Sequence, residues 1–152
     1  MLVKTLIGAA MQLTSPVHSA DWQFTQWDMS QAQVLAASKG SLTAYSNPSH
    51  DRGDSKAKLA GTYSAGGFDF TAILSFDLQD HLTYVELDPL HPGQCDDLLQ
   101  KLQRNYGLPA TRTEAGMDWV DAPNRNKIFM FYVETTCSVT YSPLNRAGAG
   151  GL

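Results

Sequence analysis

The sequence predicts an α+β domain with two layers, in which an antiparallel β-sheet of about six to seven strands packs against two helices. Two observations favour this fold class. Runs of alternating apolar and polar residues flank Gly66 and Gly67, a pattern typical of a β-hairpin. A helical segment followed by strands also occurs twice along the chain, so we expect a helix–β-meander unit in each half.

Residues 1–20 predict a secretory signal peptide. Lys4 supplies the positive charge, the apolar run that follows is too short to span a bilayer, and Ser19 and Ala20 are small. The alternative is a mature N-terminal strand or helix, but the segment has neither clean periodicity nor a cap. We therefore expect a signal peptide at 1–20, a single α+β domain at 21–144 and a disordered tail at 145–152. The expected location is periplasmic or secreted.

Charge and hydropathy argue against two classes of partner. The chain of 152 residues has a net charge of −4, and no cluster of Lys or Arg that would bind nucleic acid or an anionic membrane surface. No apolar run after Leu13 approaches membrane length, so membrane insertion is not expected. The oligomeric state is left open.

The first helix is predicted at about 31–39. Ser30 is a good N-cap, Gln33 completes a capping box, and Gly40 provides a stop. The aromatic stretch from Trp22 to Trp27 precedes this helix, and we expect it to add an edge strand or to hold the N-terminus against the core.

A strand around 42–45 and a polar loop at 47–56 are expected next. The loop has no apolar anchor, so we expect it to be mobile. It contains Arg52, Gly53 and Asp54, a tripeptide that animal integrins bind, and we interpret this match as chance because a short motif needs a confirming context.

The alternating runs predict a specific register. A two-residue turn at Gly66 and Gly67 places the apolar residues of both strands on one face, and a second turn near Asp80 extends that face to a third strand. The predicted pairs are Ala65 with Phe68, Tyr63 with Phe70, Gly61 with Ala72, Leu59 with Leu74, Leu74 with Val85, and Ala72 with Leu87.

The second helix is amphipathic and ends at Gly107. Its acidic first turn and basic last turn complement the helix dipole. Three further strands are expected around 117–121, 127–134 and 137–142. The apolar stripe of the helix contains Cys95, Leu98, Leu99, Leu102 and Tyr106.

The even number of cysteines favours a disulfide between Cys95 and Cys137 in an oxidising compartment. Cys95 lies on the apolar stripe of the second helix, and Cys137 lies on the apolar face of the last strand, so both are expected to face the interface between helix and sheet. The alternative is two separate buried thiols.

None of the candidate catalytic or metal-binding motifs has the structural context that its chemistry requires. The S-x-x-K match starting at Ser55 lies in a polar loop leading into a strand, whereas penicillin-recognising enzymes need that serine at a helix start. His91 and Cys95 could bind zinc together with Cys137, but Pro92 and Gly93 spoil the helical spacing between them. The carboxylate pairs in 77–80 and 96–97 are interpreted as a turn and a helix start. We therefore predict no catalytic residue, no metal and no cofactor.

The segment from Phe24 to Leu35 resembles the opening of two groups of small secreted bacterial domains, the β-lactamase inhibitory protein family and the SmpA/OmlA outer-membrane assembly lipoproteins. Both groups carry an aromatic residue, then Gly-Met-Ser/Thr, three variable residues and Val, followed by a helix and a β-meander. Asp28 stands here where their glycine does, and the N-terminal lipidated Cys of the SmpA/OmlA group is missing. The resemblance implies a protein-binding surface on the sheet.

The predicted function is therefore a secreted, periplasmic, non-catalytic protein-binding or inhibitory domain with an unknown partner. The alternative is a carrier of a small molecule or lipid, or an undetected hydrolase, that uses the concave face of the sheet. An apolar cavity of several hundred cubic ångströms walled by Phe70, Leu74 and Phe131 would favour the alternative, whereas a filled core would favour the protein-binding domain. Candidate exposed aromatics for partner binding are Trp22, Trp27, Tyr45, Tyr84 and Trp119.

Overall fold

The computed structural model describes residues 21–144, which form one eight-stranded antiparallel sheet with the order β1-β2-β3-β4-β8-β7-β6-β5. The predicted signal peptide and tail lie outside the described residues. The strands are β1 (Thr43–Ala44), β2 (Lys56–Ala65), β3 (Phe68–Phe76), β4 (Leu82–Pro89), β5 (Thr111–Arg112), β6 (Gly116–Asp121), β7 (Asn126–Val133) and β8 (Thr136–Pro143). The helices are α1 (Gln31–Ala37), the short 3-10 helix η1 (Pro48–His50) and α2 (Cys95–Tyr106).

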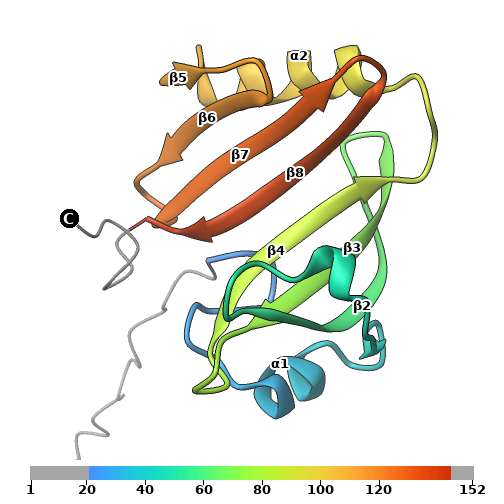
Figure 1. Ribbon diagram of the computed structural model, residues 1–152, viewed down its shortest axis with the longest axis vertical. Helices are drawn as coiled ribbons and strands as arrows, with labels where there is room; N and C mark the ends of the chain where they lie inside the picture. Colours follow the sequence, from blue (N-terminus) through green and yellow to red (C-terminus); the bar gives the residue numbers. More distant parts are fainter. Residues whose placement is uncertain (1–20, 145–152) are drawn as a thin grey trace, which may run out of the picture.

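The predicted α+β fold with two layers and six to seven strands is wrong in both respects. All eight strands belong to one sheet, and α1 and α2 lie at opposite ends of it (Figure 1), so they do not form a continuous second layer. The strand that the sequence analysis missed is β5. It has only two residues, both exposed, and therefore shows no alternation that could reveal it.

The sheet consists of two halves with the same order of elements, a helix followed by four strands. The last strands of the halves, β4 and β8, meet through a ladder of only three residue pairs, whereas β7 and β8 share eight. The strand order is therefore symmetrical about the β4–β8 junction, and the halves splay apart beyond it (Figure 1).

The hairpin register predicted from the alternating runs is confirmed. Tyr63 pairs with Phe70, and the turn glycines adopt φ values of +60° at Gly66 and +86° at Gly67. A glycine is also required at Gly61, because a Cβ atom there would lie 2.1 Å from the carbonyl oxygen of Ser41. The segment after α1 thus crosses close over β2.

Both helices begin where the sequence predicts. Ser30 and Gln33 form the capping box of α1, which ends two residues earlier than predicted, and α2 ends at Gly107. In the part of the chain that the structure describes, no helix is long and apolar enough to cross a membrane.

One main core cluster lies on the face of the sheet that the helices cover. Val34 of α1 and Leu98 and Leu102 of α2 belong to it. The largest fully buried side chains are Trp119, Phe76, Leu59, Ile73, Leu74, Leu82, Ile128 and Met130. All but Ile73 belong to this cluster.

The disulfide between Cys95 and Cys137 is confirmed, with Cα atoms 5.8 Å apart across a sequence separation of 42 residues. It joins the first residue of α2 to β8, so it holds the second helix to the sheet.

The start of the described chain is held to the second half of the sheet. The buried carboxylate of Asp21 accepts hydrogen bonds from the Arg125 side chain at 2.6 Å and from the backbone N–H of Trp27 at 2.7 Å. Asn126 donates to the Asp21 carbonyl and accepts from Nε1 of Trp27. The N-terminal segment thus packs against the core, one of the two predicted roles.

Candidate functional site

The face of the sheet opposite the helices carries the polar side chains of β4. Because successive strand residues point to opposite faces and Leu87 belongs to the core, Glu86 and Asp88 point to the other face. Glu86 pairs with Thr140 in β8, which in turn pairs with Phe129 in β7, so the same face continues across the junction. We call this surface the open face.

The polar loop at 47–56 lies over the open face and makes polar contacts there through His50 and Arg52, although it has no apolar anchor. The Asn47 side chain caps η1 by accepting a hydrogen bond from the N–H of Ser49 at 3.1 Å. Asp51 accepts from the N–H of Ala57 at 3.0 Å and pairs with Lys56 at 3.2 Å. The anchors are side-chain hydrogen bonds and not apolar contacts, and this is why a search for apolar residues missed them.

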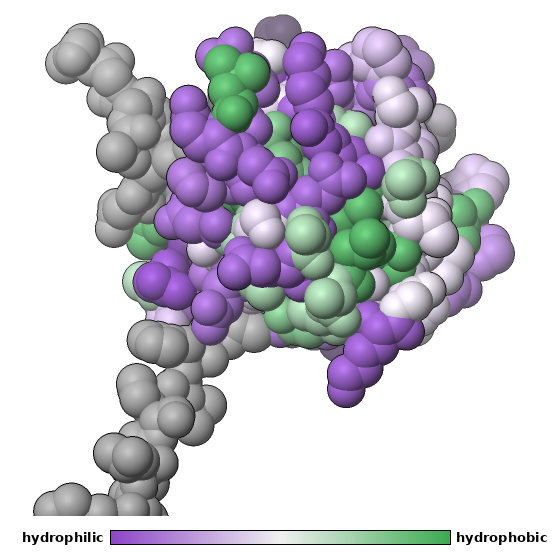
Figure 2. Space-filling model, turned by 90° about the horizontal axis from the view of Figure 1, so that it is seen from below, coloured by the Kyte–Doolittle hydropathy of each residue, from purple (hydrophilic) through white to green (hydrophobic). Residues whose placement is uncertain are grey.

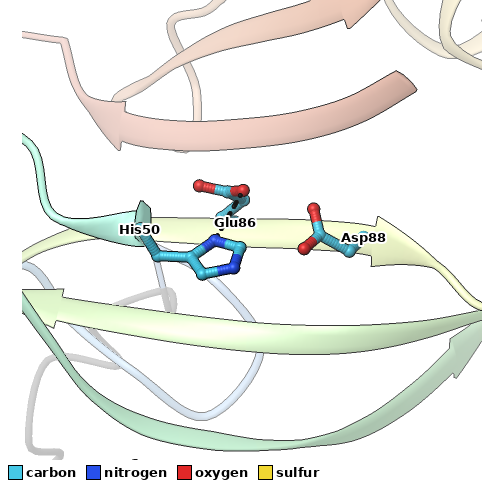
Figure 3. Close-up of side chains that lie close together, drawn as sticks. All are labelled: His50, Glu86 and Asp88. Carbon is cyan, nitrogen blue, oxygen red and sulfur yellow. Dashed lines mark hydrogen bonds and ion pairs between the residues drawn. The ribbon is translucent and has the colours of Figure 1, made fainter. Parts of the chain in front are cut away.

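The loop places an imidazole beside two carboxylates. Nδ1 of His50 lies 3.2 Å from Oε1 of Glu86, and one ligand atom each from His50, Glu86 and Asp88 lie within 4.8 Å of one another. Figure 3 shows the imidazole alongside both carboxylates, which project from the same side of β4. We call these three residues the His50 cluster. Arg52 donates to Oε2 of Glu86 at 2.6 Å and to Oγ1 of Thr140 at 3.0 Å.

The two carboxyl groups of the His50 cluster have shifted pKa values of opposite sign. Burial and the negative charge of Glu86 raise the pKa of Asp88 to about 6. Burial acts against ionisation of Glu86 too, but the hydrogen bond and charge of Arg52 and the charge of His50 hold its pKa below the ordinary value. One carboxyl group therefore stays ionised while the other exchanges a proton in mildly acidic solution. The cluster can hold a proton or a cation.

Two of the predicted aromatic candidates lie beside this cluster. The ring centroid of Tyr45 is 6.1 Å from that of His50, in an edge-to-face arrangement, and the Arg52 guanidinium lies 5.5 Å from the ring centroid of Tyr84. Both tyrosines are half-buried. They orient the imidazole and the guanidinium.

The other three aromatic candidates are not exposed partner-binding residues. Trp22 and Trp119 are buried in the core, and the indole N–H of Trp119 donates to the carbonyl of Gly107 at 2.9 Å. Trp27 is half-buried and packs against the core while bonded to Asn126. Their candidacy is corrected because the rings of Trp22 and Trp119 fill the core and that of Trp27 packs against it, and the indole N–H groups of Trp27 and Trp119 donate hydrogen bonds within the protein.

The open face of the second half carries apolar side chains instead. Phe129 and Phe131 of β7 are half-buried, while Val120 of β6 is 52 % exposed and Val133 of β7 is 40 % exposed. The strand register places all four on one face. No helix or loop crosses β6, β7 and β8 on the near side in Figure 1. We call these four residues the β6–β7 patch.

A separate hollow lies on the helix side of the sheet. Its volume is about 100 Å³. The residues lining it are Tyr63, Ala65, Gly66, Phe68, Phe70, Leu87, Leu98, Lys101, Leu102, Asn105, Val139 and Tyr141. Of the cavity walls expected for a carrier, it includes Phe70 but neither Leu74 nor Phe131.

The end of the molecule with α1 has a mixed surface. Seen from below, most of it is hydrophilic, with one group of apolar residues near the centre of the view and a separate apolar side chain near its upper edge (Figure 2). Leu35 of α1 and Leu78 of the turn between β3 and β4 are exposed. This end lies away from β6 and β7, so it is distinct from the β6–β7 patch.

The zinc site considered from the sequence is not formed. Cys95 and Cys137 are joined in the disulfide, and His91 instead lies 3.3 Å from Asp69. Disulfide sulfurs lack the thiolate charge that zinc requires.

The two carboxylate pairs have the structural roles predicted for them. Asp77 accepts from the backbone N–H groups of Gln79 and His81 in the turn after β3. Asp96 lies in the first turn of α2 and accepts a hydrogen bond from Tyr132.

Local sequence patterns do not reveal the His50 cluster, because His50 and Glu86 lie 36 residues apart. The one local signal is that Glu86 and Asp88 alternate with the apolar residues Val85 and Leu87 in β4, so the two acidic side chains share one face of the strand. A scan against protein-family models and searches of curated proteins and of solved structures found no match to this chain.

Proposed function

We propose that the chain is a secreted, periplasmic, non-catalytic domain that binds or inhibits another protein, and that it does so through the β6–β7 patch. The observation that carries the proposal is a group of four apolar side chains, the exposed Val120 and Val133 and the half-buried Phe129 and Phe131, on the part of the open face that β6 and β7 form and that no described helix covers. Exposed apolar patches rimmed by polar groups are typical of protein-binding surfaces. The rim here includes Asp118, Lys127 and Thr140.

The size of the hollow supports a protein ligand over a small molecule. Pockets for drug-sized ligands have volumes of about 300–1,000 Å³. The hollow beside α2 holds about 100 Å³, and the expected cavity walls Leu74 and Phe131 take no part in it. This hollow therefore does not support a carrier or hydrolase of the kind considered from the sequence.

Two further observations support export. The disulfide between Cys95 and Cys137 is the kind of bond that persists in oxidising compartments. Lys4, the short apolar run and the small residues before Asp21 have the order expected in a signal peptide. The resemblance of the segment from Phe24 to Leu35 to secreted inhibitory domains is part of the same proposal.

The test is capture of a partner from an extract of the native host with the wild type and three single variants of the protein. The wild type should retain a specific protein, whereas Val120→Asp and Val133→Asp should reduce its capture at least tenfold. Leu108→Asp is the matched control, since Leu108 is 85 % exposed but lies outside the patch, between α2 and β5. Equal loss with all three variants, or with none, would contradict the proposed surface.

A further inference from the structure

The His50 cluster offers a site for a metal ion, which is independent of the protein-binding surface proposed above. We propose that His50, Glu86 and Asp88 bind one zinc ion through one imidazole nitrogen and two carboxylate oxygens. Neither the disulfide cysteines nor the other histidines take part.

The spacing of the ligand atoms suits the ion. Ligands at zinc's usual bond lengths in a tetrahedral site lie about 3.4 Å from one another. Nδ1 of His50 and Oε1 of Glu86 are already 3.2 Å apart, and the set including Asp88 spans no more than 4.8 Å. A side-chain rotation that moves the Asp88 carboxylate by no more than about 1.5 Å would bring the third ligand atom to the same spacing. Three protein ligands leave the fourth position for water.

The chemistry of the ligands selects the ion. Imidazole suits zinc and similar transition metals, whereas calcium and magnesium prefer sites made only of oxygen. His50 therefore favours zinc over the hard cations, and the carboxylates of Glu86 and Asp88 are ordinary zinc ligands.

Surrounding side chains already hold the ligands in place. Arg52 uses only Oε2 of Glu86, which leaves Oε1 directed at His50. Thr140 fixes the same guanidinium, and the Tyr45 ring packs edge-on against the imidazole. Such outer partners orient ligands in known metal sites and raise affinity.

The charges of the His50 cluster also favour binding of a cation. Arg52 pairs with Glu86, but within residues 21–144 no basic side chain forms an ion pair with Asp88. Asp88 is half-buried and has the like-charged Glu86 as its neighbour. A bound divalent ion would neutralise both carboxylates at once.

The chain contains a natural comparison for this cluster. His91 and Asp69 form another histidine–carboxylate pair, at 3.3 Å, and both side chains are largely exposed. That pair has no third ligand among the described residues, since the one three-ligand group found there is the His50 cluster. If one histidine and one carboxylate were enough to bind zinc, the His91–Asp69 pair and the His50 cluster would bind it equally.

The experiment is calorimetric titration of zinc chloride into the untagged, chelator-stripped protein. The wild type should bind one equivalent, and His50→Ala and Asp88→Asn should each weaken binding at least tenfold. His91→Ala should leave it unchanged. Each variant is first shown by its thermal transition to be folded without metal.

A second readout assigns the ligand directly. In NMR spectra of the imidazole nitrogens, zinc should move the resonances of His50 and leave those of His91 and His81 in place. No binding by the wild type, or retained affinity in both His50→Ala and Asp88→Asn, would overturn the proposal. Calcium chloride at the same concentrations should give no comparable heat, and equal calcium binding would contradict the choice of ion.

Discussion

Arg52, in the loop before β2, donates a hydrogen bond of 3.0 Å to Oγ1 of Thr140 in β8, 88 residues further along the chain. The same guanidinium pairs with Glu86 at 2.6 Å. Glu86 and Thr140 face each other in the short ladder that joins the two halves of the sheet. One side chain thus ties the loop to both halves at their junction.

Removal of that side chain should loosen the junction. Arg52→Met leaves the half-buried Glu86 carboxylate without its charged partner, and we expect a loss of about 1–2 kcal/mol in the free energy of unfolding. This range is discounted for solvent screening because the Arg52 side chain is 37 % exposed. Urea denaturation measures it. Arg112→Met, on the exposed edge strand β5, is the control and should change stability by less than about 0.5 kcal/mol.

The raised pKa of Asp88 predicts a pH dependence of stability. Its pKa of about 6 exceeds the ordinary value of 3.8, so the folded state retains a proton that the unfolded chain has released between these pH values. This contribution to stability is fully present below the unfolded pKa and is lost as the pH rises through the folded pKa. The free energy of unfolding of Asp88→Asn, relative to wild type, should therefore increase from about pH 4 to pH 7, by about 1 kcal/mol after discounting for exposure.

Urea denaturation of both proteins across this range, in the presence of a chelator, checks the sign. A constant difference between the variant and the wild type would show that Asp88 titrates with an ordinary pKa.

The hairpin register predicts that truncation of a core leucine lowers the free energy of unfolding strongly, whereas truncation of a nearby exposed leucine lowers it little. Leu74 in β3 is fully buried, so Leu74→Ala should destabilise by about 2–5 kcal/mol through lost burial and the cavity left behind. Leu78, in the turn after β3, is 72 % exposed, and Leu78→Ala should cost less than about 0.5 kcal/mol. Similar costs at both positions, measured by thermal or urea unfolding, would mean that the register is wrong.

Loss of the disulfide should destabilise the second half. The bond spans 42 residues, and the chain-entropy account gives about 4 kcal/mol for a loop of this length. The double variant Cys95→Ser with Cys137→Ser should lose a comparable amount, and α2 should exchange its amide hydrogens faster than α1. If the exchange of α2 were unchanged, the bond would not be what holds that helix to the sheet.

The sequence predicted those parts of the fold that depend on local patterns. Gly66 and Gly67 with two alternating runs determine the hairpin, and Ser30 with Gln33 determines the start of α1. The arrangement of the halves could not be predicted in this way. The β4–β8 junction depends on pairing between strands more than fifty residues apart in sequence.

The site was harder to predict than the fold for the same physical reason. Hydrophobic periodicity shows that Glu86 and Asp88 face away from the core, but it does not show what crosses above them. The loop that brings His50 there is held by hydrogen bonds of Asn47 and Asp51, which leave no periodic pattern. The mistaken candidacy of Trp22 and Trp119 has another cause, since composition alone does not distinguish a buried indole from an exposed one.

The most direct test of the central claim, that the β6–β7 patch binds a protein partner, is site-specific photo-crosslinking in the native host. A photoreactive residue is placed at Val133 in the patch and, as the control, at Leu108 outside it. We expect a crosslink to one discrete protein from position 133 and none from position 108. Crosslinks of equal yield from both positions, or a discrete crosslink from position 108 alone, would contradict it.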